Sequence, residues 1–151
     1  MKHDHVRSLL SQSLVELASA RRHLDYSFQQ VTGLPDTLQD ATERQLESAE
    51  AFTGRFARAV DLLVNKVLRS LDRAELRADG TLLDVVNRAE KRGFVTHAEV
   101  LREMKDVRNM IAHDYAGANA TEIFAYCRQQ MPAFDVICEL VSNYVTRLLS
   151  A

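Results

Sequence analysis

Glycine and proline are scarce in this chain. Its 151 residues include five glycines and two prolines, too few for the many turns of a sandwich or barrel built from short strands. Apolar residues instead recur at intervals of three and four, which is the spacing of one helical face. We therefore predict an all-α fold, and the length is that of a single domain over residues 1–151.

The first half of the chain predicts two long helices. Apolar residues from Val6 to Phe28 mark the first, which ends at the turn 31–36, and the second runs from about residue 38 to 76. A run of that length is long for a globular helix, so a kink or break is expected near residues 48–54, where Gly54 is the weak point.

Two shorter helices are predicted next. Thr81 is an acceptable N-cap for a third helix that ends at Gly93. Thr96 followed by Glu99 has the spacing of a capping box for a fourth helix, which ends before Gly117.

A last helical segment opens with the cap pair Asn119 and Glu122 and continues to the C-terminus. Pro132 is expected to split or bend it. Four to five helices joined by short loops predict an up-and-down bundle.

Charge and cysteine content narrow the classes of function. With 19 Lys plus Arg against 21 Asp plus Glu, the net charge of −2 gives no broad basic excess, so any RNA contact must be local. Cys127 and Cys138 lack the paired spacing of a zinc site and are interpreted as small buried hydrophobes in a reducing compartment. With no apolar targeting region or membrane-spanning run, the sequence predicts a soluble cytoplasmic protein with no membrane contact.

The end of the predicted fourth helix combines residue types used in catalysis. Its buried stripe consists of Val100, Met104, Val107 and Ile111. Arg108 lies only about 50° from the centre of that stripe. A guanidinium at the margin of an apolar face needs a carboxylate, an anion or a second protein surface as its partner. Pairing with a nearby acid would be an ordinary structural role.

His113 follows Arg108 by five residues, which is about 140° of rotation in an unbroken helix. The two side chains converge if the helix ends before or at His113 and the imidazole swings back, or if two copies meet across a twofold axis. Alternatively, His113 is a cation that the dipole favours at the end of the helix.

The segment from Arg108 through Asn109 to His113 resembles the R-[polar]-x3-H signature of the HEPN superfamily. Tyr115 extends it to R-x4-H-x-Y, as in the HepT-type toxins of HEPN/MNT toxin–antitoxin systems. The order of helices also resembles the HEPN bundle over most of the chain. This resemblance implies a metal-independent endoribonuclease that acts as a homodimer, with two motifs in one cleft and no cofactor.

The residue types suit cleavage of RNA through its own 2′-hydroxyl. His113 would move the proton, and Arg108 would hold the charge of the phosphorane. By likeness to the family, Asn109 would orient the histidine or bind a phosphate oxygen. The resemblance further implies that a partner nucleotidyltransferase, the MNT-type antitoxin, attaches AMP to Tyr115. The ordinary alternative for Tyr115 is a partly exposed residue at the edge of the bundle.

Two other functions are compatible with the same sequence. The bundle would serve a nucleotidyltransferase as a non-catalytic substrate-binding or regulatory partner, or it would be a structural dimer whose motif pairs charges across the interface. The intact Arg108 and His113 favour the ribonuclease over the non-catalytic partner.

Overall fold

The computed structural model describes residues 2–114 and 117–151, and every regular element within these ranges is a helix. The elements are α1 (Lys2–Val31), α2 (Glu43–Asp61), the π-helical segment η1 (Leu62–Leu68), α3 (Arg69–Ala74), α4 (Leu82–Lys91), α5 (Ala98–His113) and α6 (Ala120–Ser150). Because α2, η1 and α3 follow one another without a break, they form one long helix. The described part of the chain therefore has five helices, and the all-α prediction is confirmed.

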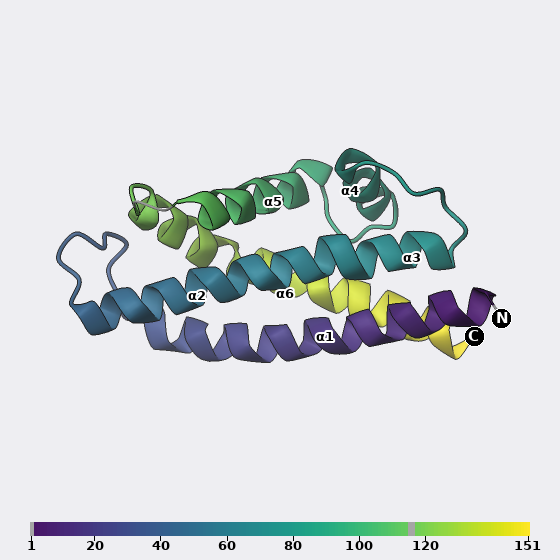
Figure 1. Ribbon diagram of the computed structural model, residues 1–151, viewed down its shortest axis with the longest axis horizontal. Coiled ribbons are helices and arrows are strands. Elements are labelled where there is room, and N and C mark those ends of the chain that lie inside the picture. The colour runs from purple at the N-terminus through teal and green to yellow at the C-terminus, as the bar shows by residue number, and fades with distance from the viewer. Residues whose placement is uncertain (1, 115–116) are drawn as a thin grey trace.

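The long helices run up and down the length of the molecule (Figure 1). α1 packs along the continuous α2–η1–α3 helix, α5 packs against α2, and α6 contacts both α1 and α2. Both termini lie at the same end, where Arg7 Nη2 donates a hydrogen bond to the carbonyl of Leu149 (2.9 Å). The C-terminal end of α5 lies at the opposite end of the bundle, near the start of α6 (Figure 1).

Phenylalanines from α2 and α6 form the centre of the core. Phe52, Phe56, Phe124 and Phe134 are fully buried, and the rings of Phe56 and Phe134 lie 5.6 Å apart. Gly54 lies on the exposed side of α2, between the two buried phenylalanines of that helix. Packing of these rings holds α2 in helical form, so the break predicted near residues 48–54 is wrong.

The irregular part of the long helix is η1 instead. Its residues Leu63, Val64, Val67 and Leu68 are all buried. Residues 62–68 contain neither glycine nor proline, so nothing local in the sequence marked this segment. Single π-helical turns within α-helices are often found at functional sites.

Capping boxes fix two helix starts. The side chain of Thr42 accepts a hydrogen bond from the backbone N–H of Gln45, and the side chain of Gln45 accepts one from the backbone N–H of Thr42. Thr81 and Asp84 form the same reciprocal pair at the start of α4. The start at Thr81 is therefore confirmed. Gly93, with φ +84°, follows the last turn of α4 as predicted, because a glycine adopts this left-handed conformation without strain.

The predicted capping box at Thr96 is wrong. α5 begins at Ala98 with His97 as its N-cap. The backbone N–H of Ala98 donates to Glu90 Oε1 on α4 (3.1 Å), so a tertiary contact replaces the expected local cap.

Asn119 stands at the N-cap of α6, as predicted, but its side chain makes no capping hydrogen bond, so the expected cap pair with Glu122 is wrong. The N–H of Asn119 donates instead to Asp114 Oδ2 (3.3 Å). The proposed split at Pro132 is wrong, because α6 is one helix over Ala120–Ser150. Pro132 is exposed, while Met131 and Phe134 beside it are buried in the core and hold both halves of the helix.

Candidate ribonuclease site at the end of α5

The last two turns of α5 carry the three catalytic residues predicted from the sequence. Arg108 is half-buried, with a side chain that is 34% exposed, whereas Asn109 and His113 are exposed. α5 ends at His113, with Asp114 as its C-cap. Tyr115 lies outside the described residues, so its modification stays a prediction.

Among the described residues, the guanidinium of Arg108 has two partners. Its Nε lies 3.5 Å from Oδ1 of Asp61, the last residue of α2, and its Nη1 donates to Asn109 Oδ1 (3.2 Å). Of the three kinds of partner expected for Arg108, a carboxylate is the one that the structure shows. Asn109, the other partner, is the next residue in the chain, and its predicted role toward His113 or a phosphate oxygen stays a prediction.

The carboxylate of Asp61 has further partners besides Arg108. Its Oδ1 accepts hydrogen bonds from Lys105 Nζ (2.5 Å) and Asn65 Nδ2 (2.7 Å). Burial raises the pKa of Asp61, but the hydrogen bond and charge of Lys105 and the charge of Arg108 outweigh burial and leave that pKa below its ordinary value. Asp61 is therefore ionised at neutral pH beside two cations.

The sequence reasoning missed Asp61, Asn65 and Lys105. Asp61 precedes Lys105 by 44 residues, so no local pattern pairs them. The available signal was the spacing of Lys105 and Arg108: two cations three residues apart share one face of a helix, and such a pair at the margin of an apolar stripe needs a carboxylate.

Arg108 and His113 leave the helix in different directions. All residues between them are helical, so the rotation of about 140° expected for an unbroken helix applies. α5 ends at His113, which meets the helix-end condition of one of the two ways in which these side chains could converge. His113 lies in the last turn, where the helix dipole favours a cation.

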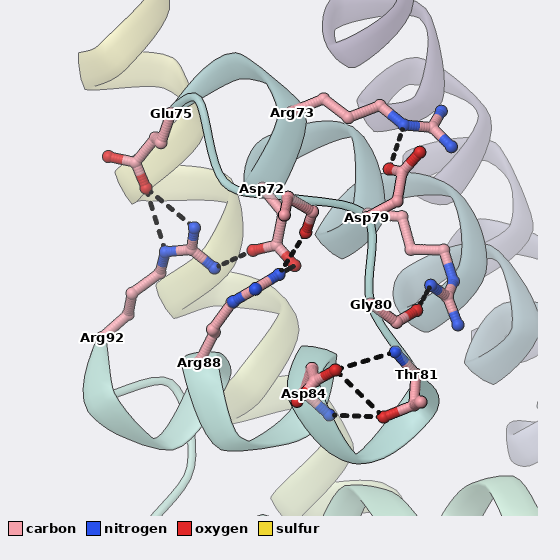
Figure 2. Close-up of polar contacts among 11 residues, drawn as sticks. Asp72, Arg73, Glu75, Asp79, Gly80, Thr81, Asp84, Arg88 and Arg92 are labelled. Carbon is pink, nitrogen blue, oxygen red and sulfur yellow. Dashed lines mark hydrogen bonds and ion pairs between the residues drawn. The ribbon is translucent and has the colours of Figure 1, made fainter.

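A second ionic cluster joins α3 to α4 at the other end of the bundle (Figures 1 and 2). Asp72 is only 3% exposed. Its Oδ2 forms an ion pair with Arg88 (3.1 Å), and its Oδ1 forms one with Arg92 (2.7 Å). Arg92 also pairs with Glu75 (2.9 Å), which accepts a hydrogen bond from Tyr144. These buried contacts fix the position of α4 and lie far from the end of α5.

Over residues 2–114 and 117–151, no three His, Cys, Asp or Glu side chains gather in a way that would hold a metal ion. None of the helices in those ranges is both long and apolar enough to span a bilayer.

An all-helical bundle with an arginine and a histidine at the end of one helix has the features of a HEPN-type protein. The family described as Ribonuclease HepT-like matches residues 13–141 of this chain, so the chain belongs to the HepT-like ribonuclease family. Membership supports a ribonuclease role in general. No curated protein and no solved structure matches the chain.

Proposed function

We propose that this protein is a metal-independent endoribonuclease toxin that acts as a homodimer. The observation that carries the proposal is the placement of Arg108, Asn109 and His113 on the last two turns of α5, in a chain that belongs to the HepT-like ribonuclease family.

The chemistry needs two groups at the scissile phosphate. His113 takes the proton of the 2′-hydroxyl as its oxygen bonds to phosphorus, and the bond from phosphorus to the 5′ oxygen breaks. Arg108 stabilises the charge on the non-bridging oxygens, and Asn109 binds a phosphate oxygen or orients the imidazole. The leaving 5′ oxygen receives a proton from the second His113 of the dimer. The products are a 2′,3′-cyclic phosphate and a 5′-hydroxyl.

The directions of the side chains support a dimeric site. Arg108 and His113 diverge by about 140° on one helix, so a single α5 does not direct both at one phosphate by helical geometry alone. Two copies of the motif related by a twofold axis supply two arginines and two histidines to one cleft. Such a cleft gathers cations locally, which accommodates the overall net charge of −2.

The direct test is incubation of the purified protein with total RNA and a metal chelator. We expect cleavage by the wild type and none by Arg108→Ala or His113→Ala, each with unchanged helix content by circular dichroism. Both side chains are at least partly exposed, so their removal leaves the core intact. If both variants cleave RNA as the wild type does, the site is misassigned; if either unfolds, that residue is structural.

We also propose that a partner MNT-type nucleotidyltransferase in the cytoplasm silences the enzyme by attaching AMP to Tyr115. The modification would add a phosphate charge and a purine close to His113 in the chain, and Arg108 would be drawn to the tethered phosphodiester instead of RNA. Tyr115→Phe should cleave RNA but gain no AMP when incubated with the partner and ATP. Additions of AMP mass that persist undiminished in Tyr115→Phe would place the modification elsewhere.

A further inference from the structure

We propose that Lys105 and Asn65 occupy Oδ1 of Asp61, the carboxylate oxygen that Arg108 approaches, so that it orients Arg108 without capturing it. Lys105 and Asn65 are then positioning residues for the proposed ribonuclease, on whose function this inference rests. Lys105, Asn65 and Arg108 each direct a donor at the same carboxylate oxygen.

All three donors approach Oδ1 of Asp61. Lys105 Nζ lies at 2.5 Å and Asn65 Nδ2 at 2.7 Å, both within hydrogen-bond distance, whereas Arg108 Nε lies at 3.5 Å. A carboxylate oxygen has about two lone-pair sites. Lys105 and Asn65 fill them, so Arg108 is held mainly by charge attraction.

Burial separates the two cations by role. The Lys105 side chain is 9% exposed, so its charge faces Asp61 rather than RNA, while the Arg108 side chain is 34% exposed. Asn65 comes from η1, which begins directly after Asp61, and its amide bonds across the first turn of that segment. The π-helical segment therefore supplies one of the two donors that fill Oδ1 of Asp61.

The arrangement matters because a phosphate must compete for Arg108. A guanidinium locked to a carboxylate by short, charge-assisted hydrogen bonds has to leave that partner before it binds another anion. Here the contact with Asp61 is long and uses Nε, and the contact with Asn109 uses Nη1. Neither of these contacts uses Nη2. The contact with the carboxylate is too long for a short ionic hydrogen bond, and the contact with Asn109 is to a neutral amide.

The test is a double-mutant cycle with Lys105→Met, Asp61→Asn and the double variant. Cleavage of an RNA oligonucleotide in chelator should fall about tenfold in kcat/KM for Lys105→Met, because the released carboxylate captures Arg108. The double variant should cleave better than Lys105→Met, because the capturing carboxylate is gone. Rates are expressed per folded molecule, with the folded fraction taken from thermal unfolding.

Arg92→Met is the matched control. Arg92 is also a buried cation on a carboxylate, at the other end of the bundle, so this variant should lose stability but keep kcat/KM per folded molecule. Wild-type activity in Lys105→Met, or a double variant no better than Lys105→Met, overturns the inference.

A second measurement is independent of ribonuclease activity. In the NMR spectrum of the RNA-free protein, the Nε–H signal of Arg108 should move downfield in Lys105→Met, as a hydrogen bond to Asp61 forms, and move back in the double variant. An unmoved signal contradicts the inference even if the protein cleaves no RNA. Loss of cleavage in the wild type, or cleavage that survives Arg108→Ala, contradicts the proposed function instead.

Discussion

Arg92 and Arg108 show how the same side chain serves two purposes in one bundle. Arg92 is 10% exposed and bound at 2.7–2.9 Å to two carboxylates, which join α4 to α3. Arg108 is 34% exposed and lies 3.5 Å from a carboxylate that is already bound by Lys105. The first is a structural contact, and the second keeps its charge available at the surface.

The two cysteines give a prediction at the level of residues. Burial raises the pKa of both Cys127 and Cys138 to about 12, so little reactive thiolate exists at neutral pH. Iodoacetamide should therefore modify neither thiol in the folded protein and both in guanidinium, as measured by intact mass. Rapid alkylation of the native protein would contradict the burial of these side chains.

The sequence predicted part of the site and missed the remainder for a physical reason. Local spacing placed Arg108 at the margin of the apolar stripe and required a partner for it. The identity of that partner depends on how α2 packs against α5, which brings together Asp61 and Arg108, 47 positions apart. No periodicity within one helix carries that information.

At the level of elements, helix starts were predictable where the cap is local. Thr81 bonds to the backbone of Asp84 within one turn, and the sequence shows the pair directly. The start of α5 was predicted at the wrong residue because its cap comes from Glu90 on another helix. The split predicted at Pro132 does not occur, because buried neighbours on both sides hold α6 in one helix. Tertiary contacts overrode the local signal in both cases.

Two glycines, one inside a helix and one just after a helix, give a prediction about backbone conformation. An added Cβ meets nothing within 4 Å at either Gly54 or Gly93, but Gly93 has φ +84° and Gly54 lies inside α2. Gly54→Ala should stabilise the fold by about 0.5–1 kcal/mol, since glycine is a poor helix former. Gly93→Ala should destabilise it by about 1 kcal/mol because alanine is strained at positive φ.

Chemical denaturation of both variants measures the difference. Because both sites have open space, the comparison isolates backbone conformation from packing. A loss of stability in Gly54→Ala would show that the helix is distorted at this position after all.

At the level of the whole molecule, the bundle places the end of α5 away from the chain termini (Figure 1). The divergence of Arg108 and His113 on α5 leads us to expect a homodimer, or an assembly of dimers, with α5 near the twofold axis. Light scattering at micromolar concentration should give twice the chain mass of 17.1 kDa or a multiple of it. A monomer at that concentration would count against the shared site.

The chemistry assigned to Arg108 and His113 is tested most directly by the ends of the RNA fragments. A defined oligonucleotide, incubated with the protein in excess chelator, should yield 2′,3′-cyclic phosphate and 5′-hydroxyl ends by mass spectrometry. A 2′-deoxy substitution at the cleaved nucleotide should abolish the reaction, because the nucleophile is removed. Fragments with 3′-hydroxyl and 5′-phosphate ends, or cleavage that stops in chelator, would contradict a mechanism in which these two residues use the 2′-hydroxyl of RNA.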